Sequence, residues 1–178
     1  AAGEFTSIGG QERHRIAALD AESGAATEWD PSADGAVPAL VLGKGAVYAG
    51  GGITSVGGQP RNYVAALDVA TGAATAWDPH ADGTVRALAE AKSSVYLGGD
   101  FTQVGWKTRN RLAAVDAATG ELAKWDPNAD GGVYAIAPMG STVYVGGLFG
   151  TIGGQSHGRL AGLDAETGAA MALDLGVG

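Results

Sequence analysis

Aspartate side chains recur along this sequence at a spacing that could serve a metal ion. The motif Trp-Asp-Pro-x-Ala-Asp-Gly occurs three times and places two carboxylates four residues apart, as Asp30/Asp34, Asp78/Asp82 and Asp126/Asp130. Two carboxylates in a glycine-containing loop could supply oxygen ligands to calcium. The loop lacks the ligand number of an EF-hand, so the sequence favours a turn here and keeps calcium binding as the alternative.

A second series of aspartates is separated by two residues from a following Ser-Gly or Thr-Gly pair: Asp20, Asp68, Asp116 and Asp164. An aspartate in this position can accept hydrogen bonds from backbone N–H groups across its own turn, while the glycine adopts a positive φ. A carboxylate that returns four times at one place in a repeat is typical of turn chemistry. We therefore expect no active site at these positions.

The other reactive side chains form no catalytic or metal-binding pattern. His14, His80 and His157 lie at three different phases of the repeat described below, so no symmetric zinc site follows from them. The sequence contains no cysteine and no nucleophile elbow for a serine hydrolase. The sequence therefore predicts a protein that is not an enzyme, with no catalytic residue, no metal ligand and no cofactor.

These side chains are set in a repeat of 48 residues. The repeat runs through the whole chain without insertion or deletion; its columns include Phe5/Ile53/Phe101/Phe149, and Trp29/Trp77/Trp125 with Leu173 at the end. A fixed period of 20 to 50 residues indicates a solenoid, a propeller or an array. The repeat therefore decides the fold class.

Each unit predicts four short strands, at 36–42, 46–53, 63–69 and 73–79 in the best-defined copy. Glycine pairs, a Thr-Gly turn and a proline end them, and nothing follows a helical period. Four antiparallel strands per 48 residues predict an all-β protein, a β-propeller, with a β-solenoid as the alternative. We expect one domain, 1–178, made of a partial blade (1–33), two blades (34–81 and 82–129) and a last blade with a degenerate end (130–178).

The phase of the repeat predicts an incomplete ring. Residues 1–5 align with 49–53, so the sequence starts within a second strand and supplies about 3.7 repeats. Open sheet edges pair with other strands. The expected partners are therefore other propeller blades or chains that complete the ring.

The recurrent tryptophans and arginines each have a structural interpretation. Trp29, Trp77 and Trp125 recur at one point of the outermost strand, where each indole is expected to pack between its blade and the next. Arg13, Arg61 and Arg109, and in a second column Arg15, Arg111 and Arg159, precede the third strand. This rim of arginines could bind carboxylates or acidic sugars, or it could bridge to the acidic turns of the neighbouring blade.

Positions at which the repeat is interrupted are the better candidates for ligand contact. Trp106 and Lys107 interrupt the "GGQ" found at 9–11, 57–59 and 153–155. Arg86 and Tyr134 share a column with Pro38, in the strand expected to line the central channel, and Glu90 shares one with Leu42 and Pro138. An aromatic residue in a loop is a suitable contact for sugar or protein; the equal alternative for Trp106 is that it covers a patch of blade edge.

The motifs of the unit carry a family resemblance. "VYLGGDF" (95–101) followed by "LAAVDAATGELAKW" (112–125) resembles the kelch repeat, and "ALDVATGAATAW" (66–77) is similar to the docking motif of pyrroloquinoline-quinone dehydrogenase propellers. The whole unit resembles bacterial, mostly secreted propeller repeats with no assigned activity, which implies an extracellular or cell-surface location. The quinone enzymes typically carry a vicinal disulfide, and the absence of cysteine argues against that activity.

Charge and composition restrict the classes of function that the sequence allows. Nineteen acidic against eleven basic residues give a net charge of −8, which argues against binding to nucleic acid, and no apolar run is long enough for membrane insertion. The expected function is non-enzymatic: an extracellular recognition or scaffold module whose partners include protein or glycan. The alternatives are a lectin-like, carbohydrate-binding propeller that uses Trp106 and the arginine rim, and a non-catalytic remnant or fragment of a larger propeller enzyme.

Overall fold

The computed structural model describes residues 1–43 and 45–172, and every regular element in this part of the chain is a β-strand. No helix in it is long and apolar enough to cross a membrane. The all-β prediction is confirmed. The main strands form three antiparallel sheets: β3 (Ala39–Leu42), β4 (Ala46–Gly50) and β7 (Val64–Asp68); β8 (Val85–Ala91), β9 (Ser94–Gly99) and β12 (Leu112–Asp116); β13 (Val133–Met139), β14 (Thr142–Gly147), β17 (Leu160–Asp164) and β18 (Ala170–Met171).

Short hairpins that the sequence reasoning missed connect the second and third strands of each repeat. They are β1 (Ser7–Ile8) with β2 (Gln11–Glu12), β5 (Ser55–Val56) with β6 (Gln59–Pro60), β10 (Gln103–Val104) with β11 (Lys107–Thr108), and β15 (Thr151–Ile152) with β16 (Gln155–Ser156). Both turn residues have positive φ, for example 58° at Gly9 and 77° at Gly10. A two-residue turn of this kind matches the twist of a hairpin, which explains the "GG" of the "GGQ" motif.

The fourth strand predicted at 73–79 is mostly absent from the described residues. It is reduced to one bridge per repeat, Leu19↔Ala26, Leu67↔Ala74 and Val115↔Leu122, and becomes a two-residue strand only as β18. Thr75 N still donates to Ala66 O, after which the chain leaves the sheet. The physical reason is that Trp77 packs toward the next repeat and Pro79 has no N–H to donate to a ladder.

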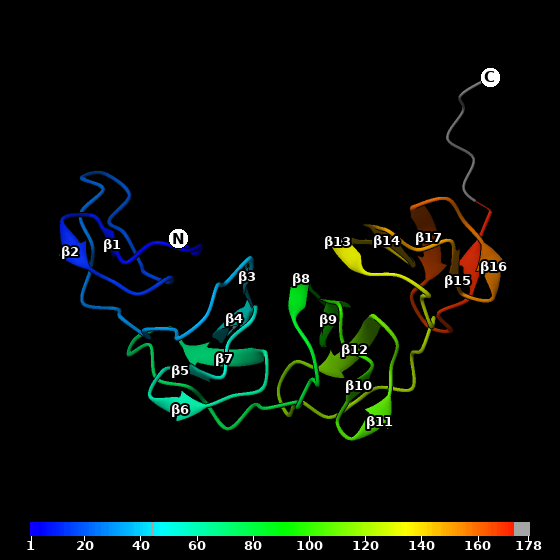
Figure 1. The fold of residues 1–178 in the computed structure, drawn as a ribbon, viewed down its shortest axis with the longest axis horizontal. Helices are drawn as coiled ribbons and strands as arrows, with labels where there is room; N and C mark the ends of the chain where they lie inside the picture. The colour runs from blue at the N-terminus through cyan, green and yellow to red at the C-terminus, as the bar shows by residue number, and fades with distance from the viewer. Residues whose placement is uncertain (44, 173–178) are drawn as a thin grey trace.

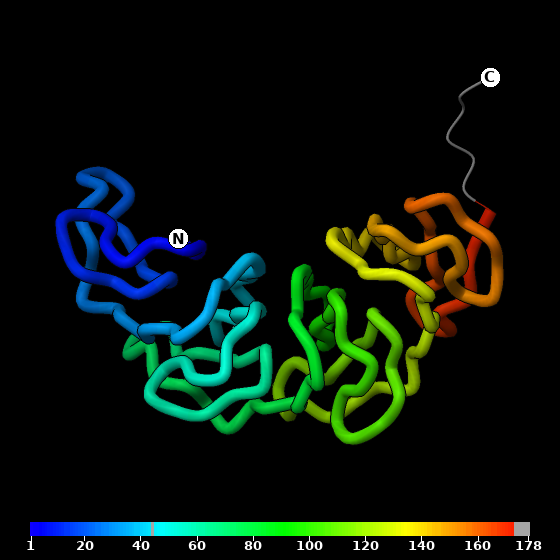
Figure 2. Tube along the Cα trace, viewed as in Figure 1, coloured from blue at the N-terminus to red at the C-terminus, as the bar shows by residue number. Residues whose placement is uncertain are grey.

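The sheets stand side by side along an open arc (Figures 1 and 2). β3, β8 and β13 line its inner side, and the first repeat, with β1 and β2, and the last sheet lie at its two ends (Figure 1). β8 contacts both β3 and β13, so successive inner strands pack against each other. The described residues thus have the layout of consecutive propeller blades and form no closed ring.

The hydrophobic core consists of three clusters, each shared by two successive repeats. The middle cluster joins Tyr48, Val64 and Trp77 of one repeat to Val85, Leu97 and Phe101 of the next. A Cβ at Gly50 would lie 2.7 Å from Val85 Cγ1, and one at Gly98 would lie 2.8 Å from Val133 Cγ1, so these glycines let the next repeat approach. Because cores lie between repeats, each repeat depends on its neighbours for burial.

Candidate interaction surfaces

The aspartates of the Asp-x-x-Ser/Thr-Gly turns accept hydrogen bonds from residues of their own turns. Oδ1 of Asp68 accepts hydrogen bonds from Thr71 N and Thr71 Oγ1, both at 2.8 Å, and from Ala70 N at 3.1 Å. The Thr71 side-chain and backbone bonds lower the pKa of Asp68. Asp20, Asp116 and Asp164 have the same arrangement and the same direction of pKa shift.

The same turns anchor the recurrent tryptophans of the preceding repeat. Trp29 Nε1 donates to Asp68 O at 2.9 Å, and this carbonyl also accepts the N–H of Gly72 at 2.9 Å. Trp77 Nε1 donates to Asp116 O at 2.9 Å and Trp125 Nε1 to Asp164 O at 3.0 Å. One carbonyl per repeat therefore serves both the local turn and the contact between repeats.

The two aspartates of each Trp-Asp-Pro-x-Ala-Asp-Gly motif face different partners. Asp82 holds the hairpin of its own repeat: Oδ1 accepts from Thr102 N at 2.7 Å and Gln103 N at 2.8 Å, and Oδ2 accepts from Thr102 Oγ1 at 2.6 Å. Burial raises the pKa of Asp82, but these hydrogen bonds outweigh it and lower the pKa overall. Asp78 instead lies 3.6 Å from His80 Nε2. In residues 1–43 and 45–172 no three His, Asp or Glu side chains are grouped to hold a metal ion.

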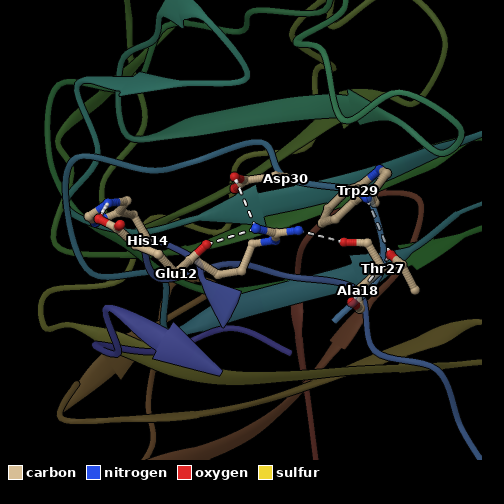
Figure 3. Close-up of polar contacts among 7 residues, drawn as sticks. Glu12, His14, Ala18, Thr27, Trp29 and Asp30 are labelled. Atoms are coloured by element: carbon tan, nitrogen blue, oxygen red, sulfur yellow. Dashed lines mark hydrogen bonds and ion pairs between the residues drawn. The ribbon is translucent and has the colours of Figure 1, made fainter. Parts of the chain in front are cut away.

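The arginines of the first column are committed to backbone carbonyls. Arg13 donates to Thr27 O and Glu12 O, both at 2.8 Å, and lies 3.7 Å from an Asp30 carboxylate oxygen (Figure 3). Its side chain is only 13% exposed, as is that of Arg109, which repeats these contacts. For these two arginines the suggested bridge to the acidic turns of a neighbouring blade is thus wrong. Arg13 and Arg109 tie the hairpin to the outer segment of their own repeat, which leaves little of them for an acidic ligand.

Trp106 lies in the turn of the β10–β11 hairpin and is the most exposed large hydrophobic side chain described, at 77%. Its φ is +62°, in a turn position that the other three repeats fill with glycine. The indole stacks on His80, with ring centroids 5.2 Å apart and an angle of 31° between the planes. Lys107 follows it as the first residue of β11 and is exposed.

His80 and its partner Asn62 were missed by the sequence reasoning. His80 Nδ1 and Asn62 Nδ2 are 2.9 Å apart, and His80 itself has a positive φ of 54°. Cavities of about 370 and 270 Å³ flank the stacked rings, one beside Lys107 and Glu121 and the other beside Asn62 and Gln103. His80 could have been selected from the sequence because its position varies between repeats, with Ser32 and Asn128 as its equivalents. We call Asn62, His80, Trp106, Lys107 and Glu121 the Trp106 surface.

Arg86 and Tyr134, two further candidates, come together near the starts of β8 and β13. Arg86 Nε lies 2.5 Å from Asp100 Oδ2, and its Cζ lies 5.5 Å from the centroid of the Tyr134 ring. Both members of the ion pair are partly exposed, and Tyr134 is 44% exposed. Asp100 was missed, although its column also varies, with Gly52 and Leu148 in the neighbouring repeats.

Glu90 lies apart from these residues. It is four positions beyond Arg86 on β8, roughly 13 Å along the strand. There it lines a cavity of about 430 Å³ with Tyr48, Trp77 and Asp116. Burial, followed by the negative charges of Glu90 and Asp116, raises the pKa of Tyr48. The five candidate contact residues thus occupy three separate places.

No protein-family model matches the chain, and no curated protein matches it. Many solved structures are similar, and two of them are described here. One is the computationally designed Ika4 protein, with TM-score 0.53 and 20% identity over 80% of this chain and 74% of Ika4. The other is BamB from Moraxella catarrhalis, with TM-score 0.55 and 19% identity over 84% of this chain and 39% of BamB.

Both similar structures are β-propellers, so the propeller-repeat fold predicted from the sequence is supported. At this level of identity the likeness shows the fold alone. It does not support the finer resemblance to kelch repeats or to a secreted family.

Proposed function

We propose that this chain is a non-enzymatic recognition scaffold, a β-propeller module of 48-residue blades that acts outside the cell or at its surface and binds a protein partner through the Trp106 surface. The propeller-like fold supports a scaffold for protein interaction. The extracellular location rests on the resemblance of the repeat to secreted propeller repeats.

The observation that carries the proposal is the placement of Trp106. An indole that is 77% exposed leaves a large apolar surface in water, and a non-glycine residue at positive φ adds about 1–3 kcal/mol of backbone strain. Stacking on His80 holds the ring in one orientation before any partner arrives. Tryptophan is among the residues most enriched at binding hot spots, and preorganisation lowers the entropy lost on binding.

The test compares the chain with Trp106→Gly, which restores the residue of the other three repeats. Because glycine accepts the positive φ, this variant should fold at least as stably as the parent chain. Both proteins are immobilised and exposed to the culture supernatant of the source cells. A partner retained by the parent is then purified and titrated, and we expect Trp106→Gly to weaken its binding 30-fold or more.

Lys107→Gln is the matched control, because it also restores the repeat residue but leaves the indole in place. It should change the affinity less than threefold, as expected for an exposed charge at the rim of an interface. Retention of the same proteins with the same affinity by the parent and Trp106→Gly would overturn the proposal.

Carbohydrate binding is the second candidate, favoured by the polar groups beside the indole. The cavity of about 370 Å³ next to Trp106 is lined by Asp78, His80, Lys107 and Glu121, which offer donors and acceptors around a flat apolar ring. A glycan array with the parent chain and Trp106→Gly tests it directly. Sugar-dependent fluorescence changes that vanish in Trp106→Gly would select this candidate over protein binding.

A further inference from the structure

The cavity of about 370 Å³ beside Trp106 gathers positions at which the repeat is interrupted. Four such residues line it, where the other three repeats have Gly, Gln, Ala and Ala: Trp106, Lys107, Glu121 and Leu122. His80 lines it as well and comes from the preceding repeat. Residues that differ from their equivalents thus meet at one place from three separate segments of the chain. We call this place the Trp106 cavity.

The Trp106 cavity lies where a hydrogen bond of the other repeats is missing. Ala74 N donates to Gly57 O at 3.0 Å, and the first and last repeats have the same bond. Among the described residues, Leu122 N makes no such bond to Gly105 O. A Cβ at Gly57 would lie 2.4 Å from Ala74 N, whereas the nearest atom to one at Gly105 is Leu122 Cβ, at 3.5 Å. The larger leucine thus holds the hairpin turn away from the outer segment, and a backbone N–H and C=O are left for a ligand.

The carboxylate of Asp78 lacks the arginine partner that its equivalents have. In the first repeat, Asp30 Oδ2 lies 3.7 Å from Arg13 Nη1, and the third repeat has the same ion pair. No such pair joins Asp78 to Arg61 in residues 1–43 and 45–172. Oδ2 of Asp78 instead lies 3.6 Å from His80 Nε2, and its Oδ1 is buried without a hydrogen-bond partner. An unpaired and partly buried carboxylate favours a positive charge beside it.

The charges that line the Trp106 cavity favour a cation. Asp78 and Glu121 carry two negative charges, against one positive charge on Lys107. The ring of Trp106 attracts a guanidinium or ammonium group through the negative face of its π-system. A guanidinium has five N–H donors in one plane, so it can serve two carboxylates and the carbonyl of Gly105 together, which a compact ammonium does less well. The lining therefore fits arginine better than lysine.

We propose, on the basis of the proposed function, that the Trp106 cavity receives an arginine side chain of the protein partner. The guanidinium packs against the indole of Trp106 and donates hydrogen bonds to the carboxylates of Asp78 and Glu121. A backbone carbonyl of the partner accepts the N–H of Leu122. Trp106 then supplies apolar contact area, while the carboxylates select a basic partner over a neutral or acidic one.

The test titrates the tripeptide acetyl-Gly-Arg-Gly-amide into the ¹⁵N-labelled chain at pH 7.5, about one unit above the ordinary histidine pKa. We expect saturable shifts at the indole N–H of Trp106 and at the amide of Leu122, and little change at Trp29 and Trp125. The same tripeptide with citrulline has nearly the same shape but no charge. It should bind roughly fivefold or more weakly, because it loses the charge-assisted hydrogen bonds and the cation–π contact.

Matched substitutions in the protein show which charges matter. Glu121→Ala restores the residue of the other three repeats at an exposed position, and it should weaken binding of the arginine peptide roughly threefold or more. Lys107→Gln also restores the repeat residue but removes a positive charge, so it should strengthen binding, by up to about threefold. Asp78→Asn should weaken binding roughly fivefold or more, whereas Asp30→Asn, at the equivalent place in the first repeat, should leave it unchanged.

Two results would contradict the assignment of arginine: equal affinity for the arginine and citrulline peptides, and unchanged affinity in both Glu121→Ala and Asp78→Asn. Preferential binding of acetyl-Gly-Glu-Gly-amide would also contradict it and would assign the cavity to an anion. The proposed function is read separately, from the purified partner. If Trp106→Gly weakens binding of that partner while Glu121→Ala and Asp78→Asn do not, the recognition surface stands and the arginine assignment fails.

Discussion

Replacing the glycine of an Asp-x-x-Thr-Gly turn should reveal how much the contact between repeats contributes to stability. Gly120 has a φ of +78°, and a Cβ there would lie 3.3 Å from Trp77 Cδ1 and 3.4 Å from Trp77 Nε1. Gly24 occupies the same place in the first repeat with a φ of +71°, but a Cβ there would meet no atom within 4 Å. The two glycines therefore share the same backbone conformation and differ mainly in that only Gly120 lies close to a side chain of the preceding repeat.

The expected magnitudes follow from two contributions. Alanine in the left-handed region costs about 1–2 kcal/mol relative to glycine, and Gly24→Ala and Gly120→Ala share this cost. At Gly120 the buried Trp77 indole must also retreat by a few tenths of an ångström, which weakens its bond to Asp116 O, a bond worth about 0.5–1.5 kcal/mol. We therefore expect Gly120→Ala to destabilise the chain by about 1 kcal/mol more than Gly24→Ala.

The assay is equilibrium urea unfolding followed by far-UV circular dichroism, with a constant slope required for comparison. Gly72→Ala is the internal replicate, because a Cβ there would lie 3.2 Å from Pro31 N of the preceding repeat. It should resemble Gly120→Ala. Equal losses in Gly24→Ala, Gly72→Ala and Gly120→Ala would refute the reasoning, since the strain of the turn alone would then account for all three.

Three further predictions use matched pairs or a change of pH. Tyr48→Phe should cost about 1 kcal/mol in urea unfolding because it removes the donor to Ala117 O, whereas Tyr96→Phe, with no such bond described, should cost less than half of that. The pKa of Asp82 is lowered in the folded chain, so its contribution to stability is full above the ordinary aspartate pKa of about 3.9 and is lost as the pH falls through the lower folded pKa. Asp82→Asn should therefore make the free energy of unfolding less dependent on pH in the acid range. Arg86→Gln removes a partly exposed ion pair and should change the free energy of unfolding by less than about 0.5 kcal/mol, and a loss above 2 kcal/mol would contradict the surface role of that pair.

Much of the fold could be predicted because the repeat constrains it. The interval of 48 residues, the glycine pairs and the Thr-Gly turns give an all-β, propeller-type chain with its strands near the observed places. The fourth strand was predicted wrongly because the strand-like segment 73–79 uses its tryptophan for the next repeat after a single bridge. The small hairpins were missed because a two-residue strand leaves no period to detect.

The candidate sites were predictable only in part. Trp106, Arg86 and Tyr134 could be selected because their positions vary between repeats. Variation alone does not show which of the variable side chains are in contact in the fold. His80 stacks on Trp106 from a position 26 residues away in the chain, and Asp100 reaches Arg86 across a strand pair. The first arginine column was predicted as a possible ligand contact, but Arg13 and Arg109 bond to backbone carbonyl groups of their own repeat. Every residue has a backbone carbonyl group, so the sequence does not show which of them an arginine will meet.

The sequence by itself determined the period, the turns and the strand ends, because these depend on local conformational preferences that glycine, proline and aspartate carry with them. Only the tertiary structure decided which polar groups meet between strands and repeats, such as Trp29 Nε1 with Asp68 O 39 residues away. Contacts of this kind depend on how the sheets pack in three dimensions, which local preferences do not fix.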